Sequence, residues 1–586
     1  MAGNAPRAHL SRRSIRKKAA KNFYFLFAII FLLAACQPSL WGTPPPPPTL
    51  GLPTIPATLP IPTLNPTFTP SPPAVTPTSA ALDKSLIWVS QAVPPSLREL
   101  YSQKGFQVST SKQDVTSLFI DIIKPSNESR NISTWTYALV APFPTLVDNL
   151  TSEELFSAWS ASSSGPFSGI PLLMDETTLA TFSEVWGQPT PGAVQLVLPE
   201  QLLETAWNQM PAWAIIPFTS IEPKWKVLMI DGQSPIQKKF DTKNYPLSIA
   251  FQLTCGDPCP HPNLNELTFD NRDSKKLTTL IMTGVTAMVR ATAATMDAKG
   301  ILYPGEAIRD MLLEADITHI NNEVPFYSHC PSPDQNQKTL VFCSSPRYIK
   351  LLNDIGTDVM ELSGDHFADY GQDAMFETMD IYKANNYSYY GGGLNLEDGR
   401  KPLLLENNGN KLMFIGCNYK DGYATATNTV PGAVPCDFDY MTGQIAYYRA
   451  QGYLPISTFQ YHEFDFPEAT PQQQIDFRTM ADAGAIIVSG SQAHAPQVME
   501  FYQGAFIHYG LGNLFFDQVP KTGRSPKQNE FIDRHIFYNG RYLGVELVTA
   551  FLEDYARPRY MKPAERIKFL TKYFSDCGWD YLQAGQ

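Results

Sequence analysis

Two stretches of the chain alternate short apolar runs with amphipathic segments, and this pattern predicts strands and helices in turn. In the first stretch, the apolar runs that predict strands are Ser85–Ser90, Ser117–Ile123, Trp135–Ala141, Val194–Leu198, Ala214–Pro217 and Trp225–Ile230. The segments that predict helices between them are Pro95–Lys104, Ser152–Ser160 and Glu200–Gln209. Strands that alternate with helices indicate a layered α/β architecture.

The second stretch, from about residue 276, repeats this alternation. Its predicted strands are Thr278–Thr283, Ile317–Ile320, Val359–Leu362, Lys411–Gly416, Leu454–Tyr461, Ala485–Ser489 and Ala505–Tyr509. Its predicted helices are Gly305–Ala315, Pro346–Ile355, Gln372–Asn385, Gly443–Gln451 and Pro471–Ala483. An irregular segment rich in Cys and Pro separates the two stretches, so we expect domains at 84–253 and 276–586 joined by a linker at 254–275.

The N-terminus has the pattern of an export signal. A cluster of Arg and Lys residues precedes the apolar run Phe23–Ala35, which is shorter than the roughly 20 residues of a membrane span. The run ends in Leu33-Ala34-Ala35-Cys36, which is similar to a bacterial lipobox. We therefore expect a lipoprotein signal peptide at 1–36 and membrane anchoring through a lipidated Cys36; an uncleaved signal anchor is the alternative.

Composition adds a tether and excludes one class of partner. Residues 37–83 are rich in Pro, Thr and Ser and have no charge before Asp83, so we expect an extended, disordered tether. The chain has 45 Lys and Arg against 56 Asp and Glu, a net charge of −11. Because nucleic-acid binding rests on basic residues that neutralise phosphates, this balance argues against a nucleic-acid partner.

The cysteines agree with an extracytoplasmic location. Apart from Cys36, six of them form near pairs along the chain: Cys255 with Cys259, Cys330 with Cys343, and Cys417 with Cys436. Disulfide bonds are stable in the oxidising surroundings that an exported protein meets. A metal site at Cys255 and Cys259 is the alternative, with His261 close by, but no second pair stands at zinc spacing. Cys577 is left over.

Polar residues that can bind metals or transfer protons follow four of the predicted strands. They are Glu323, Asp365 with His366, His462, and the pair Gln492 and His494. Open α/β sheets build their sites at these carboxyl ends of strands. Carboxylate, amide and imidazole groups that converge there suit Mn, Mg, Fe or Zn.

The same blocks carry a family resemblance over residues 278 to 520. Phe506–Asp517 is similar to "YSLGNFVFD" of the CapA-type capsule and poly-gamma-glutamate synthesis proteins, and Asp316 with Asn321–Pro325 to their "AD…NLETP". The segment Asp365–Gly371 resembles "NNHxxDYG", His462-Glu463 resembles "HWGxEY", and Ala481–His494 resembles "DAGADxVxGHHPH". The resemblance implies a calcineurin-like metallophosphatase fold with four α/β/β/α layers. The first stretch is similar, at the level of fold, to one lobe of a solute-binding protein.

Three departures from the family pattern affect the expected site. Val285 follows Gly284 where the family has a metal-binding Asp, Asp365 replaces an Asn, and Gln492 replaces a His. Two hypotheses remain open. Either Glu323, Asp365, His462 and His494, with Gln492 marginal, still bind a divalent metal and His366 with Asp365 acts in catalysis as a metal-dependent hydrolase, or the metal site has degenerated in a binding or scaffold protein.

The resemblance also implies partners and a location. It implies a cell-envelope lipoprotein that acts in synthesis or export of an anionic polymer such as poly-gamma-glutamate. The expected partners are the membrane, the anionic polymer or its precursor, and a polymer synthase complex.

Overall fold

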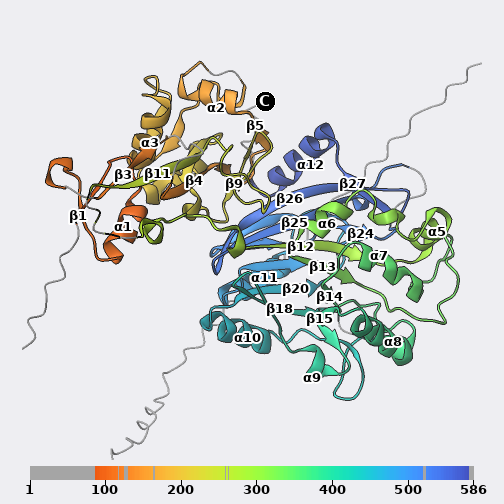
Figure 1. Ribbon diagram of the computed structural model, residues 1–586. Coiled ribbons are helices and arrows are strands. Elements are labelled where there is room, and N and C mark those ends of the chain that lie inside the picture. The colour runs from red at the N-terminus through yellow and green to blue at the C-terminus, as the bar shows by residue number, and fades with distance from the viewer. Residues whose placement is uncertain are drawn as a thin grey trace, which may run out of the picture. The chain divides into compact units, whose positions relative to one another are not determined.

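The computed structural model describes residues 86–579, apart from 116–117, 124–129, 163–164, 258, 260, 262, 421, 492 and 519–522. All of the described residues belong to one compact unit, Ala80–Gln586 (Figure 1). The predicted signal peptide at 1–36, the tether at 37–83 and the lipidated Cys36 lie outside the described residues.

The first part of the described chain is built on one mixed sheet. Its strands follow the order β2-β1-β3-β11-β4-β8-β6-β7, with β9 also paired to β4. The strands are β1 Leu86–Val89, β2 Gln107–Ser109, β3 Leu118–Ile123, β4 Ile132–Pro142, β6 Leu172–Met174, β7 Val194–Leu196, β8 Trp213–Pro217, β9 Trp225–Val227 and β11 Ser248–Cys255. A short parallel pair, β5 Asn149–Leu150 and β10 Met229–Ile230, lies apart from this sheet in the pairing pattern.

Four helices accompany this sheet, and polar caps mark where two of them begin. They are α1 Pro95–Gln103, α2 Ser152–Trp159, α3 Glu176–Trp186 and α4 Leu202–Asn208. Thr151 and Glu154 form a reciprocal capping box at the start of α2, and Asp175 caps α3. Large apolar side chains such as Tyr101, Phe182 and Phe251 fill the core between helices and sheet.

The second part contains two larger sheets. The first has the order β15-β14-β13-β12-β25-β26-β27, with β24 paired to β12. Its strands are β12 Leu277–Thr286, β13 Ile317–Asn322, β14 Val359–Glu361, β15 Ser388–Tyr390, β24 Asn513–Phe515, β25 Asn529–Tyr538, β26 Arg541–Glu553 and β27 Arg557–Tyr560.

The other large sheet has the order β17-β18-β20-β21-β23-β22. Its strands are β17 Leu403–Asn407, β18 Asn410–Asn418, β20 Leu454–Gln460, β21 Ile487–Gly490, β22 Met499–Tyr502 and β23 Ala505–His508. A small antiparallel pair is formed by β16 Gly392–Gly393 and β19 Gly432–Ala433. The helices of this part are α5 Arg290–Lys299, α6 Arg309–Glu314, α7 Ile349–Asp354, α8 Gly371–Ala384, α9 Leu396–Gly399, α10 Phe438–Ala450, α11 Pro471–Asp482 and α12 Pro563–Asp576.

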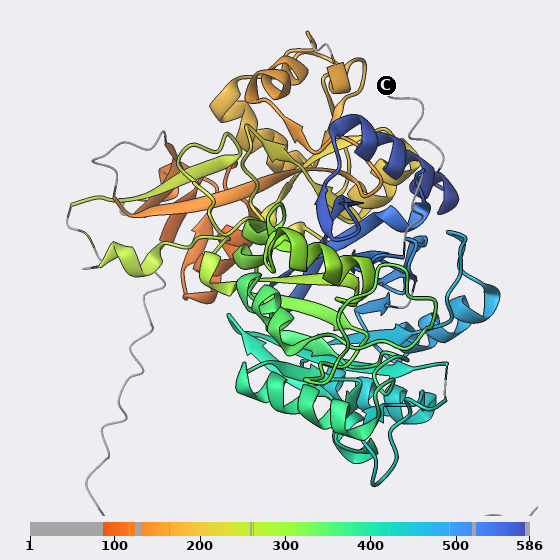
Figure 2. The ribbon, with the colours of Figure 1, turned by 90° about the vertical axis from the view of Figure 1, so that its right-hand side faces the viewer.

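Alternate side chains of these strands pack into different layers. In β12, Leu280 and Met282 join a core shared with Phe414 and Ile456 of the other sheet. Between them, Ile281 points into a core under helices α5 to α8. Another core lies between the second sheet and helices α10 and α11. The order helix, sheet, sheet, helix (Figure 1, Figure 2) confirms the predicted α/β fold class with its α/β/β/α arrangement.

Three disulfide bonds join the predicted pairs Cys255–Cys259, Cys330–Cys343 and Cys417–Cys436. The disulfide prediction is therefore confirmed, and Cys577 is a free thiol. Bonds of this kind are typical of proteins that reside outside the cytoplasm. In the part of the chain that the structure describes, no helix combines the length and the apolar character that a membrane crossing requires.

Candidate metal and anion site

The candidate site lies where parallel strands of both sheets end. Strands β12, β13 and β14 are parallel, as are β18, β20 and β21, so their carboxyl ends share an edge in each sheet. Glu323 directly follows β13, Asp365 and His366 follow β14, and Lys420 follows β18. Gln460 is the last residue of β20. Strand direction alone therefore brings these side chains to one region.

Glu323, Asp365 and His366 form a compact group at this edge. One potential ligand atom from each lies within 4.8 Å of the others. The buried amide of Gln460 links the two acids, because its Nε2 donates to Asp365 Oδ1 at 3.0 Å and to Glu323 Oε1 at 3.3 Å. The strand ends and the hydrogen bonds of Gln460 therefore hold these side chains in position.

A lysine supplies the nearest cation to this group. Lys420 Nζ lies 2.6 Å from Asp365 Oδ2, and the two side chains are 25% and 19% exposed. Burial opposes the negative charge of Asp365, but Lys420 and His366 outweigh it and hold the pKa of this carboxyl below its usual value. Asp365 therefore stays ionised at neutral pH.

In Glu323, by contrast with Asp365, the surroundings favour the protonated form. It is buried, and its Oε2 atom has no hydrogen-bond partner among the described residues. Burial and the negative charge of Asp365 raise the pKa of Glu323 to about 8. Near neutral pH this side chain therefore holds a proton, or it needs a cation in the proton's place.

His366 is held as a cation. Its Nδ1 lies 2.8 Å from Asp369 Oδ2, and Asp369 also accepts hydrogen bonds from the Phe342 amide and the Tyr423 hydroxyl. Burial opposes the charge of the imidazole, but Asp369 and the carboxylates of the group outweigh burial and raise the pKa of His366 to about 9. The protonated ring donates Nδ1–H to Asp369 and keeps a second proton on Nε2.

Two other predicted ligands lie outside this compact group. His494 is buried, and its Nδ1 contacts Asn513 Oδ1 at 2.7 Å, while burial lowers its pKa to about 4. His462 is exposed, and its ring packs 5.3 Å from that of Tyr419. The structure therefore brings together Glu323, Asp365 and His366. Gln492 is not among the described residues.

An apolar cluster occupies the position of the expected family Asp. Val285 is fully buried and packs with Val324, Phe342 and Phe516, among others. A second metal ion on this side of the site would need oxygen or nitrogen ligands, and these apolar side chains provide none.

The remaining donors fit a single divalent cation. Glu323 offers a buried carboxylate oxygen to which no described residue donates a hydrogen bond, and Asp365 lies within reach of the same point. The carboxylates favour hard ions such as Mg or Mn, whereas His366 would have to lose its Nε2 proton before it could bind Zn or Fe. The structure thus supports a divalent metal without identifying it.

Lys420, Gln460 and the buried acid Glu361 were not expected at this site. Glu361 accepts hydrogen bonds from Ser363 at 2.5 Å and Ser491 at 2.9 Å, and burial raises its pKa. Lys420 follows the predicted strand Lys411–Gly416 by a few residues, so the rule that found the acids also points to it. The contact of Lys420 with Asp365, which the sequence does not show, places this lysine at the site.

Known proteins share the part of the chain that carries this site. Residues 279–518 match the family model described as bacterial capsule synthesis protein PGA_cap. The capsule biosynthesis protein CapA of Bacillus anthracis is 25% identical over 279 residues, and the PGA biosynthesis protein CapA of Bacillus subtilis (strain 168) is 30% identical over 190 residues. These alignments cover 46% and 31% of this chain, and 66% and 49% of the relatives. The chain thus spans between half and two thirds of the length of these curated relatives.

Solved structures give weaker likenesses. A 5'-nucleotidase precursor from Thermus thermophilus has a TM-score of 0.29 and 13% identity, covering 52% of this chain and 59% of its own. An ABC-type phosphate transport receptor from Vibrio cholerae has a TM-score of 0.24 and 15% identity, covering 31% of this chain and 91% of its own. These scores are too low to assign a fold family, which rests here on the strand order. Together with the CapA relatives and the motifs at the strand ends, the family match identifies residues 279–518 as a CapA-type domain of the bacterial capsule synthesis proteins.

Proposed function

We propose that the chain acts in the synthesis or export of an anionic capsule polymer such as poly-gamma-glutamate, and that its CapA-type domain binds one divalent cation. The family match over residues 279–518 supports the role in capsule synthesis. The buried, unpartnered oxygen of Glu323 beside Asp365 and His366 is the observation that carries the cation site.

The chain's own residues are arranged to hold an anionic group at this site. Lys420 and His366 are positively charged, and their side chains remain 25% and 18% exposed, so a carboxylate or phosphate can reach them from solvent. Asp369 orients the His366 ring through Nδ1, which leaves the Nε2 proton for a bound group. His366 is therefore our candidate general acid, and Asp365 fixes Lys420 beside it. A bound divalent cation would supply Lewis-acid polarisation of the same group.

A non-catalytic binding or scaffold role is the second candidate. Val285 and its apolar neighbours favour it, because a two-metal centre cannot form on that side of the site. The ion pair of Lys420 with Asp365 favours it as well, since a fixed ammonium already compensates part of the negative charge. Turnover of a substrate is therefore a separate question from cation binding.

Calorimetric titration of the full chain with Mn²⁺ tests the cation site. We expect one ion per chain, with affinity reduced tenfold or more in Glu323→Gln, in line with the loss of a supporting ligand. Glu397→Gln, an exposed acid in a surface pair with Arg400, is the matched control and should bind as the parent does. Two ions per chain, or none, would contradict the proposal.

Hydrolysis of a phosphoester or of the polymer's amide bond then separates the two candidates. Activity that depends on Mn²⁺ and falls at least a hundredfold in His366→Asn supports the hydrolase. Cation binding without such activity supports the binding or scaffold role. Loss of surface polymer in cells that lack the chain, restored by the wild type, tests the capsule role itself.

We propose further that Cys36 carries a lipid and anchors the chain to the outer face of the membrane, with a polymer synthase complex as its partner. The lipobox-like sequence before Cys36 and the three disulfide bonds support this location. Labelling with a radioactive fatty acid should mark the parent chain and not Cys36→Ser, and a parent chain without label would argue for an uncleaved anchor.

A further inference from the structure

A cavity of about 520 Å³ shares no lining residue with the candidate metal and anion site. One wall comes from the first part of the chain, around strands β9 and β10. The opposite wall comes from strands β25 and β26 and helix α12. Its volume lies within the range of about 300 to 1,000 Å³ that is typical of small-molecule sites.

Most of the cavity lining is apolar. Phe143, Trp225 and Ile236 contribute from one wall, and Leu543 and Leu570 from the other. Each of these side chains is at most 4% exposed, so the walls are packed rather than loose. An apolar body of a ligand would therefore be shielded from water here.

Three basic side chains interrupt the apolar lining, together with the acids Asp148, Glu314 and Glu546. Lys226 Nζ donates to Thr145 O at 2.6 Å and to Asp148 Oδ1 at 2.7 Å. Arg566 donates to both oxygens of Asp148, from Nε at 2.8 Å and from an amino group at 2.9 Å. Arg534 pairs with Glu546 across the β25–β26 ladder.

These basic groups have more N–H donors than the acceptors among residues 86–579 that the structure describes take up. Lys226 has three N–H donors, of which two are engaged, and Arg566 has five, of which four are engaged, two of them by Leu547 O and Thr549. Arg534 uses one donor on Glu546. Because Asp148 accepts three hydrogen bonds already, the surplus donors favour an acceptor brought by a ligand.

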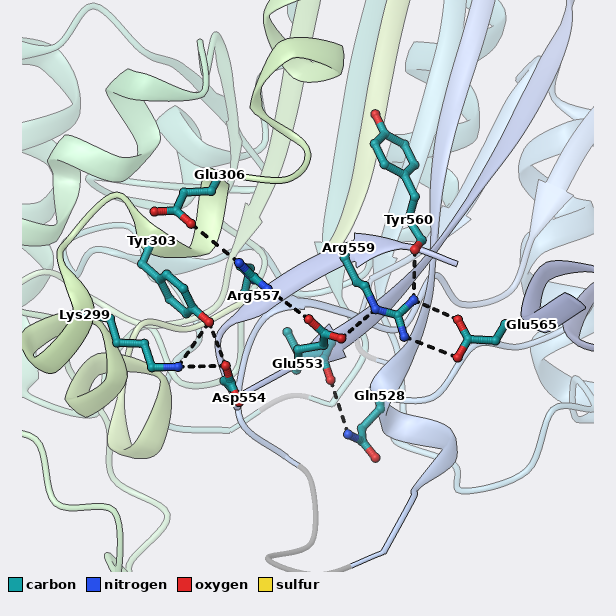
Figure 3. A network of polar contacts seen from close by, with 11 residues as sticks. Lys299, Tyr303, Glu306, Gln528, Glu553, Asp554, Arg557, Arg559, Tyr560 and Glu565 are labelled. Atoms are coloured by element: carbon teal, nitrogen blue, oxygen red, sulfur yellow. Dashed lines mark hydrogen bonds and ion pairs between the residues drawn. The ribbon is translucent and has the colours of Figure 1, made fainter. Parts of the chain in front are cut away.

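Ion pairs hold the strand and helix that form the far wall. Arg559 of β27 donates to Glu553 at 2.7 Å and to Glu565 at 2.8 Å, as Figure 3 shows. This network fixes β27, whose Tyr560 lines the cavity, to the first turn of α12, which carries Arg566 one residue after Glu565. The wall is therefore formed in advance of any ligand.

We propose that this cavity binds an amphipathic anion, with a carboxylate or phosphate head on Lys226, Arg534 and Arg566 and an apolar chain among Phe143, Trp225 and Leu543. Asp148 and Glu546 neutralise part of the basic charge, and the N–H donors that they leave over favour a head group with several acceptor oxygens. The apolar lining selects the rest of the molecule. The inference is independent of the cation site, because no residue of the cavity belongs to the Glu323–Asp365–His366 group.

The test uses the chain from residue 37, which lacks the apolar run Phe23–Ala35 and keeps the whole compact unit Ala80–Gln586, so that no detergent is needed, and four probes below their micellar concentrations. The probes are dodecanoate, dodecyl phosphate, dodecanol and dodecyltrimethylammonium, measured by calorimetry. We expect the anions to bind at least tenfold more tightly than the alcohol, and the ammonium probe more weakly still. The dodecanoate and dodecyl phosphate arms distinguish a fatty acid from a phosphate-bearing lipid as the natural source.

Variants locate the binding. Val227→Phe fills the cavity and should abolish binding of every probe, whereas Lys226→Met and Arg534→Gln should each weaken the anions tenfold or more and leave dodecanol unchanged. Asp148 keeps its bonds from Arg566 in Lys226→Met, and Arg534→Gln serves if that variant does not fold. Lys299→Met, in an exposed pair with Asp554, is the control. No binding, equal binding of all probes, or binding that survives Val227→Phe would overturn the proposal.

Discussion

Replacing Lys420 by Met tests whether this lysine is the internal counter-ion of the candidate metal and anion site. The methionine keeps the length of the side chain and removes its charge. In the parent chain the Lys420 ammonium lies 2.6 Å from Asp365 Oδ2. After the change, Asp365 keeps the hydrogen bond from Gln460, the hydrogen bond with Glu323 and the charge of His366, but it loses its strongest cationic partner.

The expected cost follows from the burial of the pair. Removing one partner of a fully buried ion pair costs about 3 to 5 kcal/mol. Because Lys420 and Asp365 remain 25% and 19% exposed, solvent screens part of this, and we expect about 2 to 3 kcal/mol at pH 7. Since a lowered carboxyl pKa contributes stability only above that pKa, the difference between variant and parent should vanish as Asp365 becomes protonated in acid.

Divalent cations should narrow the gap in stability, because a tenfold gain in affinity is worth about 1.4 kcal/mol at saturation. Lys420→Met frees Asp365 Oδ2 and removes a positive charge that repels a cation, so Mn²⁺ should bind at least tenfold more tightly than to the parent chain. Thermal unfolding followed by circular dichroism, in EDTA and in excess Mn²⁺, measures both effects on the full chain. Lys299→Met removes a pair that is about half exposed on both sides, and should change stability little.

The reasoning about Lys420 is refuted by either of two results. One is a variant as stable as the parent in EDTA at pH 7, which would mean that the ammonium does not compensate Asp365. The other is a loss of stability that Mn²⁺ leaves undiminished, which would mean that Glu323 and Asp365 do not form a cation site.

Three further predictions concern single protonation sites. Burial lowers the pKa of His535 from 6.5 to about 4, so the unfolded chain takes up a proton at higher pH than the folded chain does. The free energy of unfolding should therefore fall by about 3 kcal/mol between pH 6.5 and 4. In His535→Gln, urea unfolding measured across this pH range should show a smaller fall. Asp369→Asn should lower the pKa of His366 by about 1 to 2, read by NMR titration of the ring, and an unchanged value would remove Asp369 from the site. Because the pKa of Glu323 is raised to about 8, the folded chain keeps a proton that the unfolded chain releases above pH 4.5. The free energy of unfolding in EDTA should therefore fall as the pH rises from 4.5 to 8. Glu323→Gln should not show this fall, and a variant whose stability falls as steeply as that of the parent would contradict the prediction.

The sequence was sufficient to find the edge at which the site forms. Glu323, Asp365 and His366 each follow a predicted strand, and the rule that parallel strands end together needs no side-chain geometry. The position of His462 did not follow from this rule. After β20, the side chain of Tyr461 is buried and its hydroxyl donates to Asp476 at 2.7 Å. The side chain of His462, which comes next, is therefore left exposed.

The stacking of the two sheets could not be read from hydrophobic periodicity. Every residue of β12 is buried, and every residue of β20 as well, so neither strand shows the alternation that marks one solvent-facing side. The layer order came instead from the family resemblance, and the structure supplied the packing of Leu280 and Ile281 into different cores.

The changes at this site are best understood as a single redistribution of charge. Val285 removes one acid from the family pattern, Asp365 adds one at the next strand, and Lys420 places a fixed cation against that new acid. With His366 protonated, two positive groups face the carboxylates, and of the Glu323–Asp365–His366 group Glu323 has a buried oxygen for which the described residues offer no donor. A site with one unmet carboxylate and two accessible cationic side chains has room for one metal ion and for an anionic group beside it. It therefore suits recognition of an acidic polymer even if the chemistry of a two-metal phosphatase is not available to it.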